Sequence, residues 1–282
     1  MSIIDAHHHL WNPAERSYPW LEDAALAPIR RPYVLDDLRG HADAAGVHRT
    51  VLVQTVSDLS ETRQFLTVAH ASRGLIAGVV GWVDLTDPDV ERTLAELRAS
   101  PGGELLVGIR HQVQDEEDPG WLLRPDVLRG LQAVAAAGLS YDLLVFPQQL
   151  AAAAGAVERV PEGRFVLDHA GKPPIRSAVL EPWATDLRRL AGHGNVACKL
   201  SGLVTEADWQ HWTMSDLRPY ADVVLESFGP GRVMAGSDWP VCELAASYAR
   251  VWEVASELVA LLAAAEQRAV LAEVAARFYR LG

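Results

Sequence analysis

A short apolar run passes directly into histidines at residues 3–11, which read Ile3-Ile4-Asp5-Ala6-His7-His8-His9-Leu10-Trp11. Side chains two residues apart on a strand point to the same face. We therefore expect His7 and His9 to share one face and His8 to lie on the other as a packing residue. Neutral imidazole is a good ligand for zinc and similar divalent cations. The stretch predicts part of a metal site at the end of a first strand, completed by residues distant in sequence.

Similar apolar runs recur along the chain, and most lack polar alternation, which is typical of parallel strands buried on both faces. The predicted strands are Ile3–Ala6, Thr50–Gln54, Ile76–Val83, Leu105–Ile109, Leu139–Val145, Arg164–Leu167, Val196–Leu200 and Arg232–Ala235. Stretches rich in Ala, Leu, Glu and Arg predict helices between them, at Asp36–Ala45, Ser60–Ser72, Val90–Ala99, Pro125–Ala137, Gln148–Val160, Ala178–Ala191 and Leu217–Phe228. This alternation predicts an α/β fold, a (β/α)8 TIM barrel, with extra C-terminal helices at Ala246–Leu262 and Glu266–Leu281.

Length and composition favour one domain over residues 1–282, because a barrel of this class needs about 250 residues and no linker interrupts the chain. An open doubly wound sheet is the alternative, but no GxGxxG motif follows the first strand. The net charge of −12 argues against a nucleic-acid partner. No apolar run is long enough to span a membrane, and the start of the chain lacks a signal-peptide pattern. Two distant cysteines, Cys198 and Cys242, fit a reducing, cytoplasmic setting.

Polar side chains gather where the predicted strands end. They include Arg110-His111, Tyr141-Asp142, Asp168-His169 with Lys172, Lys199-Leu200-Ser201 and Asp238-Trp239. The carboxyl ends of barrel strands meet at one end of the fold, where barrel enzymes keep their active sites. We therefore expect these clusters to converge with His7 and His9.

With these motifs the chain resembles the amidohydrolase superfamily, and within it the hydrolases of sugar lactones such as L-fuconolactone and L-rhamnonolactone. Residues 5–11 (DAHHHLW), 167–173 (LDHAGKP) and 236–240 (GSDWP) resemble the metal motifs of the first, sixth and eighth strands. Residues 108–116 (GIRHQVQDE), 141–147 (YDLLVFP) and 199–207 (KLSGLVTEA) resemble segments of the sugar-lactonase group. The resemblance covers nearly the whole chain.

The resemblance implies a site for one divalent metal ion, zinc, surrounded by His7, His9, His169 and Asp238. The fourth strand lacks the lysine that bridges two metals in binuclear members, and the fifth shows Tyr141-Asp142 in place of a histidine ligand. One metal is therefore expected rather than two. Metal-independent catalysis is the alternative that the same branch of the family implies.

The expected catalytic residues are Asp238, His169 and Arg110. Asp238 would take a proton from water and return it to the leaving oxygen. Arg110 would polarise the carbonyl, or else form a structural pair with Asp142 or Asp115. His169 is either a metal ligand or a hydrogen-bonding electrophile. Asp168 should point elsewhere by strand alternation and is left out.

The expected substrate contacts are His111, Trp11, Tyr141, Trp239 and Lys172. Indole rings can stack on a sugar, although the tryptophans could equally form part of the packed barrel mouth. His111 could serve structure as readily as substrate, and loop lysines such as Lys172 are often simply solvated.

The resulting hypothesis is hydrolysis of a sugar aldonolactone to its aldonic acid, with a small-molecule sugar lactone as the only partner and no predicted oligomeric state. A metal-dependent decarboxylase and a dicarboxylate-lactone hydrolase are alternatives that would need more cationic groups at the site. A non-catalytic sugar-binding barrel is a further alternative, since a fold alone does not imply activity.

Overall fold

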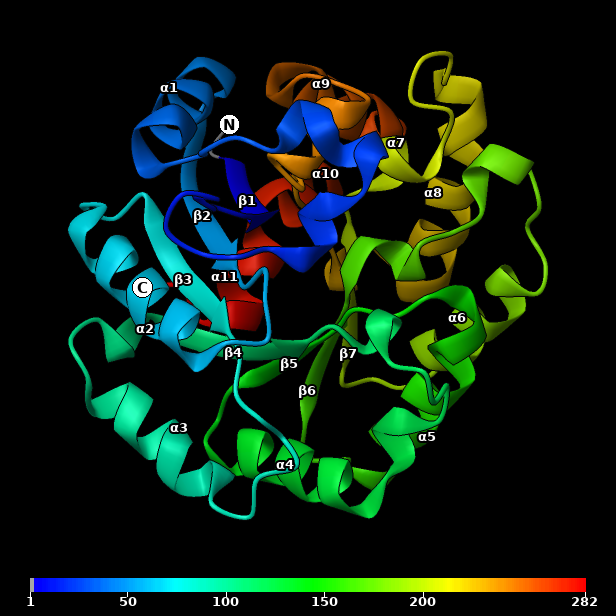
Figure 1. The fold of residues 1–282 in the computed structure, drawn as a ribbon. Helices are drawn as coiled ribbons and strands as arrows, with labels where there is room; N and C mark the ends of the chain where they lie inside the picture. The colour runs from blue at the N-terminus through cyan, green and yellow to red at the C-terminus, as the bar shows by residue number, and fades with distance from the viewer. Residues whose placement is uncertain (1–2) are drawn as a thin grey trace.

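Eight parallel strands form one sheet in which each strand pairs with the next along the chain. The structure is a computed structural model that describes residues 3–282, with the strands around a central axis and helices outside them (Figure 1). The strands are β1 (Ile3–His8), β2 (Val47–Val53), β3 (Ile76–Gly81), β4 (Leu106–His111), β5 (Ser140–Leu143), β6 (Arg164–Leu167), β7 (Val196–Leu200) and β8 (Val233–Ala235). Just beyond β1 and β8, His9 N donates to Trp239 O at 2.7 Å and Asp238 N donates to His7 O at 2.8 Å, which completes the ring. The predicted (β/α)8 barrel is confirmed.

The helices largely follow the prediction. They are α1 (Leu35–Ala45), α2 (Leu59–Ala71), α3 (Val90–Ala99), α4 (Pro125–Ala136), α5 (Leu150–Arg159), α6 (Trp183–Ala191), α7 (Leu203–Glu206), α8 (Met214–Phe228), α9 (Tyr248–Val259), α10 (Ala264–Arg268) and α11 (Val274–Tyr279). The predicted start of α6 at Ala178 was wrong. Pro182 disfavours a helical conformation of the residue before it, and Ala178 adopts a left-handed φ of 54°. The short helix α7 lies in a stretch expected to be irregular. Within residues 3–282, none of these helices is long and apolar enough to cross a membrane.

The long segment between β1 and α1 is folded against the mouth of the barrel. It contains two 3₁₀ turns, Pro19–Glu22 and Ala24–Ile29. Trp11 and Tyr33 exchange main-chain hydrogen bonds at 3.1 and 2.8 Å, so the segment begins and ends at one place. Arg16 pairs with Asp58 at the start of α2. These contacts hold the segment as a wall of the barrel mouth.

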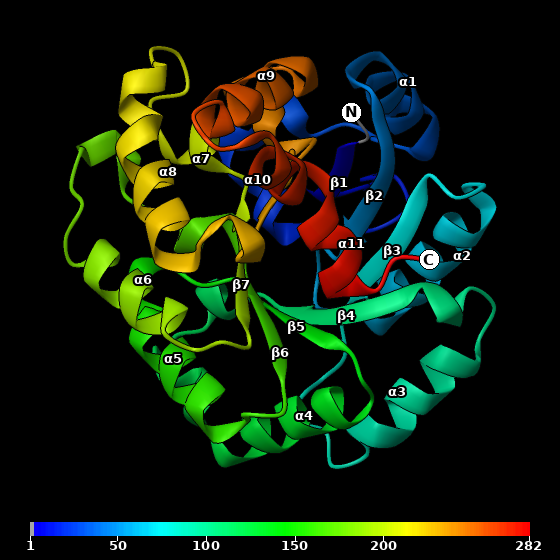
Figure 2. The same ribbon diagram turned by 180° about the vertical axis from the view of Figure 1, so that it is seen from behind.

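The amino-terminal end of the barrel is closed by the predicted C-terminal helices. A π-helical turn at Ala269–Glu273 links α10 to α11, and apolar side chains from this region pack against interior residues of the strands (Figure 2). Tyr279 extends deeper, where its hydroxyl donates to Asp142 Oδ2 at 2.7 Å. These contacts fill the barrel interior from its amino-terminal end.

Candidate active site

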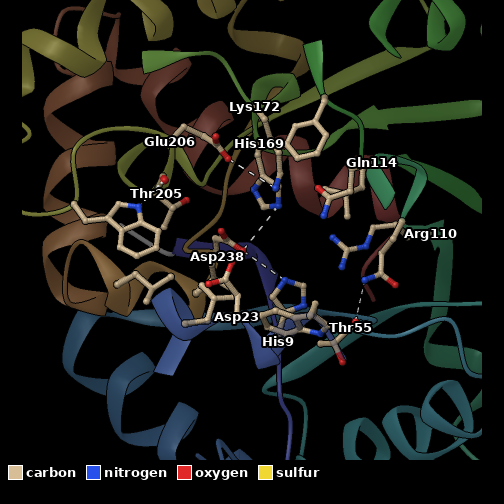
Figure 3. A pocket seen from close by; sticks show the side chains of 18 residues that line it. His9, Asp23, Thr55, Arg110, Gln114, His169, Lys172, Thr205, Glu206 and Asp238 are labelled. Atoms are coloured by element: carbon tan, nitrogen blue, oxygen red, sulfur yellow. Dashed lines mark hydrogen bonds and ion pairs between the residues drawn. The ribbon is translucent and has the colours of Figure 1, made fainter. Parts of the chain in front are cut away.

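A cavity of about 420 Å³ opens at the carboxyl ends of the strands, within the size range of small-molecule sites. Residues at or just beyond the ends of five strands line it: His9, Thr55, Arg110, His169 and Asp238 (Figure 3). The predicted convergence of distant strand ends is therefore seen in the structure. Lys172, also predicted, lies in the wall of the same cavity.

Three imidazoles surround one carboxylate oxygen at the base of the cavity. Asp238 Oδ1 lies 3.5 Å from His9 Nε2, 3.8 Å from His7 Nε2 and 3.9 Å from His169 Nε2. The two nitrogens of His7 and His9 are only 3.0 Å apart. The four residues predicted to surround a metal thus point their reactive atoms at one small volume.

Hydrogen bonds on the far side of the rings fix this orientation. His9 Nδ1 lies 2.8 Å from Val53 O, and His169 Nδ1 lies 3.0 Å from Ser201 Oγ. Such outer partners set the orientation of an imidazole and leave Nε2 directed at the site. The strand ends of β2 and β7 therefore orient ligand atoms that belong to β1 and β6.

The His8 side chain points in the predicted direction, and the Asp168 side chain does not. His8 points away from the site and its Nε2 lies 2.9 Å from Thr50 Oγ1, so it packs within the barrel wall as expected. Asp168 was expected to point elsewhere, yet it faces the same interior as His169. The reason is that Asp168 continues the alternation of Val166, which packs in the barrel interior, whereas the left-handed φ of 51° at His169 turns the His169 ring to the same side.

The position of the His169 ring requires a glycine at position 202. A Cβ atom added to Gly202 would lie 2.7 Å from His169 Nδ1, and Gly202 itself has a φ of +67°. We expect Gly202→Ala to push His169 from its position and lower kcat/KM about 100-fold, because small misplacements at a reacting centre have effects of this size. Gly46→Ala is the matched control, since Gly46 has a φ of +70° with open space around it. Equal losses of activity in both variants would contradict a role for close approach to His169.

A buried charge cluster lies beneath the histidines. Lys199 is 0% exposed, and its Nζ lies 2.7 Å from Asp142 Oδ2, 2.9 Å from Asp168 Oδ1 and 3.1 Å from His7 Nδ1. Asp168 Oδ2 also accepts a hydrogen bond from Arg110 Nη1 at 3.0 Å. From the sequence, Lys199 was expected only to lie in a polar cluster at the end of a strand, with no partner assigned to it. The available signal was its position inside an apolar strand, where a charged side chain must be paired.

Arg110 is held in one orientation by residues just after β2 and β6. Nη1 bonds Asp168, and Nη2 donates to Gln54 O and, at 3.1 Å, to Gln54 Oε1. The structural partner is therefore Asp168 and not Asp142 or Asp115, the two considered from the sequence. Since Arg110 also lines the cavity, pairing with Asp168 and contact with substrate are compatible roles.

Burial keeps the three histidines neutral. Desolvation lowers the pKa of His169 to about 4 and lowers the pKa of His9, and burial together with Lys199 holds the pKa of His7 well below its ordinary value. Burial alone would raise the pKa of Asp238, but His169 and His9 lower it below its usual range. Neutral imidazoles beside an ionised carboxylate form a suitable donor set for a divalent cation and leave Asp238 able to accept a proton.

The donor set fits a single cation. His7, His9 and Asp238 offer ligand atoms within 4.8 Å of one another, and so do His7, Asp168 and His169. Two nitrogens on a tetrahedral zinc ion stand roughly 3.3 Å apart, close to the 3.0 Å between His7 Nε2 and His9 Nε2. Two lone pairs at this distance would repel, so a hydrogen or a cation must lie between them.

Three predicted substrate contacts lie in packed regions outside the cavity lining. The ring of Tyr33 contacts Trp11 edge-on at 5.2 Å and Trp239 at 5.3 Å between centroids, so both indoles pack beneath the long first segment. Tyr141 is buried against Phe165, because its neighbours on β5 point inward and alternation turns it toward the helices. These assignments are therefore corrected to packing roles.

The predicted role of His111 as a substrate contact is also corrected, because this residue has a structural role. Its ring stacks on Trp121 at 4.3 Å, accepts a hydrogen bond from Trp82 Nε1 at 3.0 Å, and lies 2.7 Å from Glu116 Oε1. Arg110 points inward, so its neighbour on β4 points outward. His111 serves to hold the loop after β4.

Aromatic and amide side chains from loops take the place of the predicted contacts. Trp20, Phe146 and Trp209 line the cavity together with Gln112 and Gln114. Sequence reasoning noted only that Trp20 lies in the long first segment. Which indole of a loop faces a cavity depends on how the loop folds back, and no local pattern encodes it.

Comparisons with known proteins agree with this geometry. The sequence pattern of the family described as Amidohydrolase matches residues 4–281. The chain belongs to the amidohydrolase family. It is 40% identical to an L-fucono-1,5-lactonase of Burkholderia multivorans, over 99% of this chain and 96% of the relative, and 40% identical to one of Burkholderia ambifaria, over 87% and 82%. A crystal structure of a Burkholderia multivorans amidohydrolase with bound zinc is 38% identical, with a TM-score of 0.93 over the full length of both chains.

Membership of the amidohydrolase family confirms the resemblance drawn from the strand-end motifs. The same motifs supply every residue at the base of the cavity: His7 and His9 from the first, His169 from the second and Asp238 from the third. In this amidohydrolase the cavity above them is walled mainly by loop residues.

Proposed function

We propose that this protein hydrolyses a sugar aldonolactone, of the kind represented by L-fucono-1,5-lactone, to the aldonic acid. The observation that carries the proposal is the ionised Asp238 carboxylate, placed beside neutral histidines at the base of a polar cavity. The 40% identity to two L-fucono-1,5-lactonases supports the choice of substrate. The proposed setting is carbohydrate metabolism in the cytoplasm, in keeping with two buried free thiols.

The proposed chemistry is general acid–base hydrolysis of an ester. Asp238 accepts a proton from water, and the resulting hydroxide attacks the lactone carbonyl carbon. Arg110, fixed by Asp168 and Gln54, stabilises the negative charge that develops on the carbonyl oxygen. Asp238 then returns the proton to the departing ring oxygen.

We propose that one divalent cation, zinc, is held by His7, His9, His169 and Asp238. When bound, it supplies positive charge that polarises the carbonyl and acidifies water. The zinc-bound relative and the donor set of this chain support the proposal. Asp168 and Lys199 help to place His7 for this role.

The alternative activities fit the cavity less well. A dicarboxylate lactone or the substrate of a decarboxylase would need several cationic groups, whereas Arg110 and Lys172 line this cavity beside Asp23, Glu206 and Asp238. A non-catalytic sugar-binding role would leave the ionised Asp238 without a function at the base of the site.

The test is a pH-indicator assay of hydrolysis with L-fuconolactone and L-rhamnonolactone, before and after treatment with a chelator and with zinc restored. We expect turnover that the chelator abolishes and zinc restores. Turnover unchanged by the chelator would overturn the zinc proposal and leave catalysis to Asp238, Arg110 and the histidines. No turnover with any lactone of a broad panel would overturn the lactonase proposal.

A further inference from the structure

Two oppositely charged side chains face the cavity and form a loose ion pair with each other. Lys172 follows β6 and Glu206 ends α7, and Nζ lies 3.8 Å from Oε1 (Figure 3). Their side chains are 20% and 25% exposed. Among residues 3–282, neither side chain makes a hydrogen bond, so the ammonium has hydrogens to donate and the carboxylate has lone pairs to offer.

The surrounding structure holds this pair in place. Lys172 adopts a left-handed φ of 52°, and its ammonium lies 5.2 Å from the centre of the Phe146 ring. On the other side, Thr205 Oγ1 donates to Gly202 O at 2.7 Å, and Trp209 Nε1 donates to Thr205 O at 2.8 Å. The wall is therefore arranged before a ligand arrives, which lowers the entropic cost of binding.

The hydrogen-bonding capacity of Lys172 and Glu206 is complementary to that of two adjacent hydroxyl groups on a ligand. A hydroxyl accepts one hydrogen bond and donates another, so one hydroxyl can accept from Lys172 while the next donates to Glu206. A carboxylate substituent at this place would meet the negative charges of Glu206 and Asp238, which lowers its affinity. Hydrogen bonds to charged groups are also stronger than those between neutral groups.

We propose that Lys172 and Glu206 bind adjacent hydroxyl groups of the lactone and make the site specific for neutral polyhydroxylated lactones. The inference rests on the proposed function and deepens it, because it adds Glu206 to the expected contact Lys172 and gives the pair a role in the choice of substrate. The pair contributes little to stability, since partly exposed ion pairs are worth about 0–1 kcal/mol, and variants should therefore fold.

The experiment compares two six-membered lactones, L-fucono-1,5-lactone and unsubstituted δ-valerolactone, which carries no hydroxyl. We expect Glu206→Ala and Lys172→Met each to raise KM for fuconolactone about 10- to 100-fold, with kcat within about threefold. For δ-valerolactone, kcat/KM should stay unchanged in both variants. Glu226→Gln, on the exposed side of α8, is the matched control and should leave KM and kcat unchanged for both substrates.

The outcomes separate this inference from the proposed function. Hydrolysis of fuconolactone by the wild type, with both lactones affected equally in the variants, would overturn the role of the pair and leave the lactonase proposal intact. Failure of the wild type on every sugar lactone would overturn the proposed function itself. If one of the two variants does not fold, the other still decides the question.

Discussion

Replacement of Asp238 by asparagine is expected to lower kcat about 10³-fold, within the range typical for loss of a general base. The asparagine amide keeps the size of the carboxylate but cannot take a proton from water. Asparagine also tolerates the left-handed φ of 57° that residue 238 adopts. The loss should therefore reflect chemistry and not a rearranged backbone.

The measurement is steady-state hydrolysis of L-fuconolactone together with a thermal unfolding curve. Asp222→Asn serves as the control, because Asp222 is half exposed on α8 and does not line the cavity. A variant with asparagine at 238 that retained near-normal kcat would remove Asp238 from the mechanism. A large drop in the melting temperature would instead assign a structural role to the residue.

Replacement of Lys199 by methionine is expected to lower the free energy of unfolding by about 3–5 kcal/mol, the usual effect of removing one partner from a buried ion pair. Lys199 is the ammonium that neutralises Asp142 and Asp168, and all three side chains are 0% exposed. Without it, two buried carboxylates would share the barrel interior with only Arg110 on the side of Asp168.

Urea unfolding of four proteins tests this expectation: wild type, Lys199→Met, Asp142→Asn and the double variant. The double variant should be more stable than Lys199→Met alone, since it no longer leaves Asp142 unpaired. Lys172→Met is the control for loss of a lysine charge and should change the unfolding free energy by less than about 1 kcal/mol. Equal destabilisation by the two lysine variants would refute the buried cluster as a stabilising element.

Much of the fold could be predicted because the barrel repeats a simple pattern. A strand such as β3 is apolar on both faces and lies between helices with a different periodicity, so it can be recognised on its own. His7 and His9 were predictable for the same reason, since alternation on one continuous strand fixes their common face. The carboxyl ends of parallel strands then bring distant motifs together without any further information.

Predictions failed where the chain leaves regular structure or where a partner lies far away in sequence. His169 faces the interior together with Asp168 because the turn after β6 is left-handed, and no neighbouring residue indicates this. Trp11 and Trp239 pack against Tyr33, whose position depends on the path of the whole first segment. The importance of Lys199 required knowledge of its two carboxylate partners, which come from β5 and the end of β6.

The hydrogen bond from Tyr279 to Asp142 joins a late segment of the chain to β5, which affects how the barrel folds during synthesis. A ribosome releases the eight strands well before residue 279, so the barrel can begin to assemble while the amino-terminal end of its interior is still open to water. Asp142 gains the hydrogen bond from Tyr279, and the barrel gains its apolar seal, only when α11 has left the exit tunnel. The barrel therefore reaches its working structure only after α11 has emerged, and arrested nascent chains exposed only as far as residue 250 should remain sensitive to protease.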